Sequence, residues 1–305
     1  ILKTLMGKKK IVLITGATGF IGFTFLQIVS KLKNYKIVAI SRNKQNKISN
    51  IFWIKDKLPL GKNSLNLIKK LKVDYLYHFA WQGIPNFTKK NCLYNFNISK
   101  DFVDFIILNT KICKIIVTGT CWEYSTNGEC NENIKPKPLN NFAKYKIKLY
   151  EHINNKITKS KINFYWLRLF YIFGPNQREN SLIPYLIKNT LNGKEIILKN
   201  KNNLLDYLSV DEVAIVLKKF LYFKPQSGIY NVGSGKNIDL IKIIKAIEKN
   251  LKKKIFIKYE KNETKNLRFW SNIKKIKNNI RWKPKITFNK AIKKTIKFYV
   301  KKNKN

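Results

Sequence analysis

The sequence predicts an α/β fold: a doubly wound parallel sheet in the first part of the chain, followed by a smaller C-terminal α+β lobe. Short apolar runs alternate with helix-length segments, at residues 11–14, 37–40, 75–80, 115–118 and 165–169. Such runs, buried on both faces, are typical of parallel strands joined by helices. A glycine-rich segment follows the first run directly, and 305 residues suit one large domain with a smaller lobe.

The glycine-rich segment Thr15–Gly22 has the spacing Gly-x-x-Gly-x-x-Gly and leads into a helical pattern over residues 23–32. Gly16 permits a tight turn, Gly19 lets the backbone approach a pyrophosphate, and Gly22 lets the helix pack closely on the strand. Free N–H groups at the helix start, together with the helix dipole, favour a phosphate. A plain turn needs only one or two glycines, so this context favours a dinucleotide-binding loop.

The later elements change in character along the chain. A helix is expected over 140–153, just after the breaker Pro136-Lys137-Pro138. From about Gly174 the chain is broken by prolines and glycines, and helical spacing returns at 242–251 and 288–299. We therefore expect two parts: an NAD(P)-binding Rossmann domain over residues 8–173, and a mainly substrate-binding lobe over 174–300 with segments that return to the sheet.

The net charge of +45 is the most unusual bulk property. The lysines are spread along the whole chain and accompany many isoleucines and asparagines, which is the composition that an AT-rich genome produces through its codons. A nucleic-acid-binding protein concentrates its charge on a stripe or motif, so we favour the compositional interpretation over a nucleic-acid partner.

Other bulk properties exclude several classes of protein. Apolar residues make up 44% of the chain, enough for a packed core, yet no apolar stretch approaches the ~18 to 20 residues of a membrane helix. The four cysteines lack metal-site spacing, so we expect no metal and a reduced compartment. The expectation is a cytoplasmic protein without a membrane partner.

The end of the second predicted strand bears on the choice of cofactor. An Asp or Glu there binds the ribose 2′-hydroxyl of NAD, whereas a nearby Arg accommodates the 2′-phosphate of NADP. The strand ends Ile40-Ser41-Arg42-Asn43, without a carboxylate. Arg42 is the natural partner for the phosphate and Ser41 can add a hydrogen bond, so we expect NADP. NAD stays open, because Arg42 can equally be one of many exposed bases.

Several motifs together resemble the extended short-chain dehydrogenase/reductase family, specifically its nucleotide-sugar epimerases, dehydratases and 4-reductases. The resemblance covers nearly the whole chain. Besides the glycine loop, it includes His78–Trp81, Gly119–Tyr124, Arg168–Pro175, Asp206–Asp211, Tyr230–Gly235 and Trp282-Lys283-Pro284.

The resemblance implies catalytic roles for a hydroxyl residue, a tyrosine and a lysine. Thr120 takes the hydroxyl role, and Lys146 would hold the nicotinamide ribose. The tyrosine position is Phe142, which has no O–H and cannot move the proton that accompanies hydride transfer at C4. Loss of a positioned acid or base typically slows a reaction about 10²- to 10⁴-fold. Tyr145 is either a substitute or a buried packing residue.

The resemblance also implies the residues that contact the two ligands. For the cofactor they are Gly16, Thr18, Gly19, Phe20, Ile21, Gly22, Ser41, Arg42, Asp56, Phe79, Ala80, Lys146 and Phe170. For the sugar nucleotide they are Trp81, Thr120, Cys121, Trp122, Arg178, Ser181 and Leu182. The planar guanidinium of Arg178 suits a diphosphate. The Arg that often precedes Asp206 in relatives is Leu205 here, which removes part of the usual diphosphate grip.

The expected function is an NAD(P)-dependent nucleotide-sugar oxidoreductase or epimerase, acting at C4 of a nucleotide-linked sugar or deoxysugar for surface polysaccharide synthesis. Relatives often form homodimers, so a homodimer is expected. The alternative is a family member that binds cofactor and nucleotide sugar without efficient turnover, because Phe142 replaces the tyrosine.

Overall fold

The computed structural model describes residues 9–42, 48–198, 200–260 and 266–304, and divides into two compact units. The first unit comprises residues up to 125 together with 135–168 and 217–230. The second comprises residues 126–134, 169–216 and 231–305. Each unit is therefore built from several separate segments of the chain.

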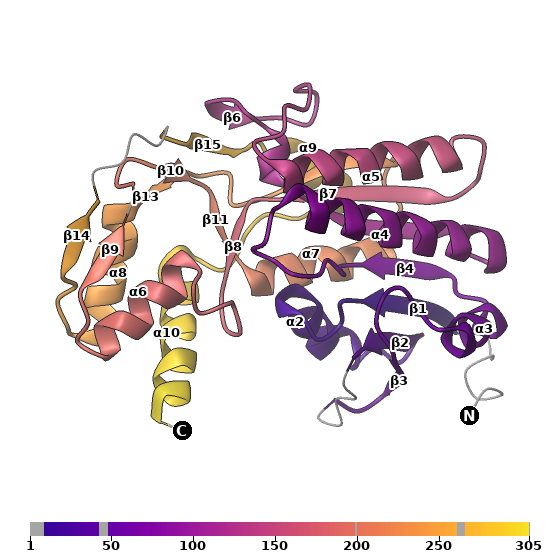
Figure 1. Ribbon diagram of the computed structural model, residues 1–305, viewed down its shortest axis with the longest axis horizontal. Helices are drawn as coiled ribbons and strands as arrows, with labels where there is room; N and C mark the ends of the chain where they lie inside the picture. The colour runs from indigo at the N-terminus through magenta and orange to yellow at the C-terminus, as the bar shows by residue number, and fades with distance from the viewer. Residues whose placement is uncertain (1–8, 43–47, 199, 261–265, 305) are drawn as a thin grey trace. The chain divides into compact units, whose positions relative to one another are not determined.

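The first unit is organised around a seven-stranded sheet with the order β12-β7-β5-β4-β1-β2-β3 (Figure 1). Its strands are β1 (Lys10–Thr15), β2 (Tyr35–Ser41), β3 (Ile51–Lys55), β4 (Tyr75–His78), β5 (Lys114–Thr120), β7 (Asn163–Leu169) and β12 (Gly228–Val232). β1 pairs in parallel with both β2 and β4, and the chain order reverses at this point. Ligands of doubly wound sheets bind beyond the carboxyl ends of the strands at such a reversal.

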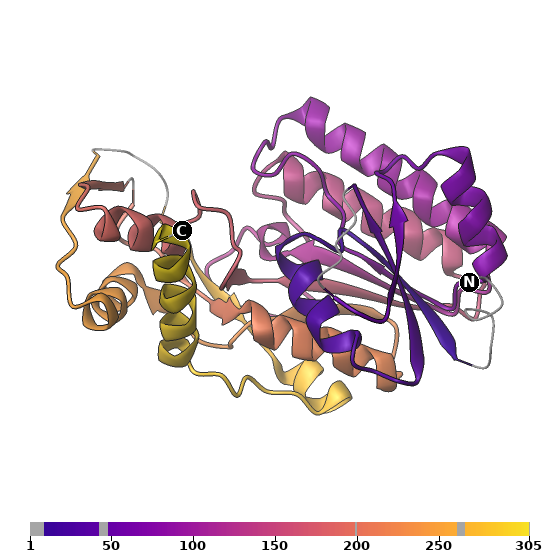
Figure 2. The same ribbon diagram turned by 90° about the horizontal axis from the view of Figure 1, so that it is seen from below.

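Helices cover both faces of this sheet (Figures 1 and 2). They are α2 (Phe20–Val29), α3 (Lys62–Leu71), α4 (Lys89–Asn109), α5 (Asn141–Ile157) and the last residues of α7 (Val210–Tyr222), with a short 3₁₀ helix η1 (Cys121–Glu123) after β5. Apolar side chains of α3, α4 and α5 join one buried cluster with those of the strands. On the other face, Phe25 of α2 packs on Tyr77, with ring centroids 4.8 Å apart, and the Tyr77 hydroxyl donates to the carbonyl of Leu217.

The described residues of the second unit contain short strands, four complete helices and the first part of α7. The strands are β6 (Gly128–Cys130), β8 (Tyr171–Phe173), β9 (Ile196–Leu198), β10 (Leu204–Leu205), β11 (Tyr207–Ser209), β13 (Ile238–Asp239), β14 (Ile257–Tyr259) and β15 (Arg268–Ser271). The helices are α6 (Leu182–Leu191), α8 (Leu240–Leu251), α9 (Lys274–Ile280) and α10 (Phe288–Lys304). One four-stranded sheet, β13-β10-β15-β6, accompanies the pairs β11–β8 and β14–β9.

A buried carboxylate organises the second unit. Asp206 is fully buried and accepts hydrogen bonds from the N–H and hydroxyl of Ser234, the N–H of Gly235, and the N–H and hydroxyl of Ser271. Burial raises the pKa of this carboxyl, opposed by the hydrogen bonds from Ser234 and Ser271. The Asp206 motif noted in the sequence thus joins three segments of the unit.

The predicted doubly wound parallel sheet is confirmed. The strand expected over residues 75–80 ends at His78, because Phe79 and Ala80 turn toward the glycine loop, where their backbone atoms lie against Gly16. In the part of the chain that the structure describes, no helix has the length and apolar character needed to cross a bilayer.

Candidate active site

The glycine loop connects β1 to α2 and packs against the end of β4. Gly16 has a φ of +64°, and a Cβ there would lie 2.8 Å from the backbone of Phe79 and Ala80. A Cβ on Gly22 would lie 2.2 Å from the Gly16 carbonyl oxygen, so a larger residue would disrupt the loop. No side chain caps the N-terminus of α2, and its first turn carries no acid. The residues therefore fit an anionic dinucleotide.

The buried side chain of His78 contacts Thr15, the residue at the start of this loop. His78 Nδ1 lies 2.7 Å from the Thr15 hydroxyl, which also accepts from the N–H of Ala80. Burial, with a smaller contribution from Lys146, lowers the pKa of His78 to about 3. The imidazole is therefore neutral at physiological pH, and it ties β1 to β4 instead of exchanging protons.

The end of β2 lies beside the glycine loop. The hydroxyls of Ser41 and Thr18 are 3.2 Å apart, and Arg42 is exposed at the strand end. Asp56 lies just after β3, where its carboxylate accepts from the N–H groups of Lys57 and Gly61. The predicted cofactor residues in the glycine loop, at the start of α2 and at the end of β2 thus lie at one edge of the sheet.

Thr120 is the last residue of β5 and the N-cap of η1. Its hydroxyl oxygen accepts from the N–H of Trp122 at 3.3 Å, which leaves the hydroxyl proton to donate. Thr120 and Cys121 are both buried, and Cys121 is not disulfide-bonded. The hydroxyl predicted from the sequence therefore lies at the carboxyl edge of the sheet, where parallel α/β sheets bind their ligands.

Lys146 of α5 is buried next to this strand end. Its Nζ donates to the Thr118 carbonyl at 2.8 Å and lies 4.5 Å from the ring centroid of Trp81. Burial lowers the pKa of Lys146 to about 7, although the negative charge of Glu123 opposes the shift. An ammonium group that releases its proton near neutral pH can take part in acid–base chemistry.

Phe142 occupies the position of the family tyrosine, and together with Trp81, Phe87 and Trp122 it forms a cluster of four aromatic side chains that we call the aromatic wall. The Phe142 ring lies 5.3 Å from Trp81, 5.1 Å from Phe87 and 6.4 Å from Trp122, measured between centroids. All four side chains are partly exposed. The sequence reasoning did not single out Phe87, because nothing in the sequence distinguishes this loop aromatic from the others.

Tyr145 lies on a different side of α5 from Phe142. It is only 4% exposed and packs on Phe96 of α4, with centroids 6.0 Å apart. Phe142 and Lys146 share one side of the helix, as their spacing requires. This placement favours the packing interpretation of Tyr145 over its role as a substitute acid.

Glu123 is a residue whose contribution the sequence reasoning missed. It is 1% exposed, and its carboxylate accepts from the N–H of Thr120, the indole N–H of Trp166 and Nε of Arg168. A signal was present, because Thr120-x-x-Glu123 has the spacing of a capping box. The carboxylate is fully occupied as a hydrogen-bond acceptor.

The remaining predicted ligand residues belong to the second unit. Phe170 is buried and packs on Phe269, with centroids 6.1 Å apart. Arg178 is exposed in the loop between β8 and α6, and Ser181 is the N-cap of α6, with Leu182 as the first helical residue. Arg178 is therefore exposed shortly before α6, whereas Ser181 and Leu182 at the start of this helix are half-buried.

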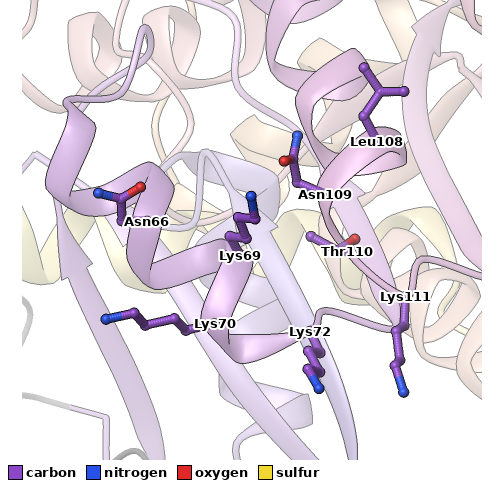
Figure 3. Close-up of a pocket in the computed structure, with 8 residues that line it drawn as sticks. All are labelled: Asn66, Lys69, Lys70, Lys72, Leu108, Asn109, Thr110 and Lys111. Carbon is purple, nitrogen blue, oxygen red and sulfur yellow. The ribbon is translucent and has the colours of Figure 1, made fainter.

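An open pocket on the first unit is lined by residues at the ends of two helices (Figure 3). It lies between the C-terminal ends of α3 and α4, which lead into the amino ends of β4 and β5. Its lining residues are Asn66, Lys69, Lys70, Lys72, Leu108, Asn109, Thr110 and Lys111. Because ligands of such sheets bind at carboxyl ends, this pocket is not part of the candidate active site.

A glycine loop at the reversal point of a parallel sheet, with a threonine and a buried lysine at the same edge, defines a nucleotide-binding site of the Rossmann class. The chain belongs to the NAD dependent epimerase/dehydratase family, which it matches over residues 12–233. This is a family of enzymes.

Individual relatives share about a quarter of their residues with this chain. An ADP-L-glycero-D-manno-heptose-6-epimerase of Brachyspira hyodysenteriae is 25% identical over 78% of this chain and 80% of its own length. A dTDP-6-deoxy-L-talose 4-dehydrogenase (NAD(+)) of Aggregatibacter actinomycetemcomitans is 27% identical over 74% and 84%. The chain thus spans most of the length of these two enzymes.

A solved structure with the same fold is a tyrosine-to-phenylalanine mutant of UDP-glucuronic acid 4-epimerase from Bacillus cereus. That structure contains UDP-4-deoxy-4-fluoro-glucuronic acid and NAD. Its TM-score is 0.85 at 21% identity, and the match covers 95% of this chain and 99% of that one.

Proposed function

We propose that this protein transfers hydride between a nicotinamide cofactor and C4 of a sugar linked to a nucleoside diphosphate. The observation that carries this proposal is that the glycine loop, Thr120 and Lys146 meet at the carboxyl edge of one parallel sheet. The Aggregatibacter actinomycetemcomitans relative supports it as well, because that protein is a 4-dehydrogenase of a nucleotide-linked deoxysugar.

The residues of this chain have distinct tasks in that reaction. The nicotinamide, when bound, supplies or accepts the hydride. Thr120 donates its hydroxyl proton in a hydrogen bond to the C4 oxygen of the sugar. In the reductive direction the C4 oxygen gains negative charge, and Lys146 supplies a proton to it through solvent at the aromatic wall. Solvent then reprotonates the Lys146 amine. Lys146 takes this part because Phe142 has no hydroxyl.

The aromatic wall supports a deoxysugar as the substrate. The partly exposed rings of Trp81, Phe87, Trp122 and Phe142 offer apolar surface, which suits a C–H face or methyl group better than a row of hydroxyls. Arg178 is the proposed partner of the diphosphate, since a guanidinium matches two phosphate oxygens at once.

NADP is the proposed cofactor. The sequence contains no Asp or Glu between Ser41 and Lys55, so the end of β2 lacks the carboxylate that NAD-specific sites use. Replacing Arg42 with Ala is expected to weaken NADPH binding about tenfold or more and to leave NADH binding nearly unchanged. Fluorescence titration with each cofactor tests this expectation, and an equal loss for both would contradict it.

The alternative proposal is a protein that binds both ligands without efficient turnover. The Bacillus cereus structure favours this alternative in one respect: a tyrosine-to-phenylalanine mutant of that epimerase contains both a nucleotide sugar and NAD. A phenylalanine in such a protein is thus compatible with binding, and only a rate measurement separates the two proposals.

A panel of 4-keto nucleotide sugars, assayed with the parent protein and with Phe142→Tyr, distinguishes these proposals. Turnover by the parent supports the active enzyme, whereas turnover by Phe142→Tyr alone establishes the impaired one. Thr120→Val should reduce kcat about 10²-fold or more, because it removes a hydroxyl at the reacting oxygen. Thr158→Val, at an exposed hydroxyl that follows α5, is the matched control.

A further inference from the structure

We infer that Glu123 is a positioning residue that fixes the orientation of Thr120 for hydride transfer, with Arg168 and Trp166 holding its carboxylate. The inference rests on the proposed function, since it concerns the hydroxyl that contacts the sugar. Glu123 lies three residues after Thr120 and is buried beneath the end of β5, so it acts through Thr120 and has no direct contact with a ligand.

The carboxylate of Glu123 is held by four hydrogen bonds from three residues. Glu123 Oε1 accepts from the Thr120 N–H at 2.9 Å and from the Trp166 indole at 3.0 Å. Its Oε2 accepts from Arg168 Nε at 2.7 Å and from the same indole at 3.1 Å. Hydrogen bonds from charged or indole donors to a buried carboxylate hold its position firmly.

Thr120 is restrained through both its backbone N–H and its side-chain hydroxyl. Its N–H donates to Glu123, while its hydroxyl oxygen accepts from the Trp122 N–H. These bonds restrain the backbone and the side chain of the same residue, and together they leave the hydroxyl proton free to donate. A misplacement of about 1 Å in a catalytic group can lower a rate about 10²-fold.

Gly119 leaves space for the Glu123 carboxylate, and Arg168 balances its charge. A Cβ on Gly119 would lie 2.2 Å from Trp166 Nε1 and 2.5 Å from Glu123 Oε1, so glycine is required there. Arg168 is 1% exposed, stacks 4.5 Å from the Tyr124 ring centroid, and neutralises Glu123. The buried pair therefore adds no net charge beside the reacting oxygen.

The geometry also excludes Glu123 as the acid of the reaction. Every group within hydrogen-bond distance of its carboxylate in the described chain is a donor. An ionised carboxylate accepts from all three donor residues, whereas the O–H of a protonated carboxyl would face an N–H, so that two donors would point at each other. Its role is therefore to orient Thr120 and not to transfer a proton.

A double-mutant cycle tests the positioning role. Glu123→Gln is expected to lower kcat about 10²-fold with KM changed less than about threefold, because binding groups are untouched. In a Thr120→Val background the same substitution should have a much smaller effect on kcat, limited to the change that the lost charge of Glu123 makes to the pKa of Lys146. An equal loss in both backgrounds, or a loss confined to KM, would overturn the inference.

A second variant guards against misfolding. Glu123→Gln leaves a buried arginine without its ion-pair partner, which can strongly destabilise the folded protein. The paired variant Glu123→Met with Arg168→Met removes both charges and should fold, and unlike glutamine its methionine at position 123 offers no oxygen to accept from the Thr120 N–H. We expect it to show the same loss of kcat as Glu123→Gln. Wild-type kcat in the folded paired variant would refute the positioning role.

A measurement independent of turnover separates this inference from the proposed function. The Thr120 amide should exchange with deuterium at least tenfold faster in the paired variant than in the parent, while amides of β4 are unchanged. If neither the parent nor Phe142→Tyr turns over any 4-keto sugar, the proposed function fails. Unchanged exchange of the Thr120 amide overturns the present inference, whatever the outcome of the activity assays.

Discussion

The protonation of Lys146 sets a specific pH dependence for the reductive reaction. Burial lowers the pKa of this ammonium to about 7, against the opposing charge of Glu123. With that pKa, about nine tenths of the molecules carry the proton at pH 6 and about one tenth at pH 8. Because reduction consumes this proton, kcat should fall about ninefold to tenfold between pH 6 and pH 8. Oxidation, which needs the neutral amine, should rise over the same interval.

The assay is steady-state oxidation of NADPH with a saturating 4-keto nucleotide sugar across this pH range. Lys146→Arg is the informative variant, because a guanidinium keeps its proton throughout and should abolish the alkaline fall even where the rate is low. In Phe142→Tyr, the phenol can supply the proton, so the fall should move to higher pH. A parent profile that is flat from pH 6 to pH 8, or an alkaline fall that persists in Lys146→Arg, would refute the reasoning.

Two further predictions concern the cofactor loop and the stability of the first unit. Gly22→Ala should raise the NADPH dissociation constant about tenfold or more, because the alanine Cβ would lie 2.2 Å from the Gly16 carbonyl oxygen. Unaltered NADPH affinity in a fluorescence titration would contradict the assignment of this loop to the cofactor. Lys114→Met should lower the free energy of unfolding in urea by about 1 to 3 kcal/mol, because the buried Lys114 ammonium donates to the carbonyls of residues 220, 221 and 223. Lys111→Met, at an exposed position, is the control, and equal effects of the two substitutions would contradict a stabilising role for these hydrogen bonds.

Much of the site could be predicted from the sequence because it depends on local patterns. The loop Thr15–Gly22 specifies its own turn and helix start, since glycine is required by contacts within the loop and with the adjoining strand. Thr120 and Lys146 were found from their motifs, and the structure brings both to the same strand end. The absence of a tyrosine at Phe142 is likewise a property of the sequence alone.

Other features could not be predicted because they depend on residues far apart in the chain. The short strands of the second unit pair with partners that no local apolar alternation indicates, such as β6 with β15. The position of Tyr145 was ambiguous in the sequence, and only the packing of α5 on α4 placed its ring on Phe96. Phe87 joined the aromatic wall through a loop that has no regular period.

The sequence by itself determined the cofactor loop, the parallel sheet, the missing carboxylate at the end of β2 and the missing phenol. Only the tertiary structure determined the burial and the hydrogen-bond partners of Glu123, which in the sequence is one of seventeen acidic residues. The physical reason is burial, because a carboxylate that is removed from water needs hydrogen-bond donors from the protein. Trp166 and Arg168 on β7 become neighbours of Glu123 only when the sheet forms. The same burial gives Lys146 its lowered pKa.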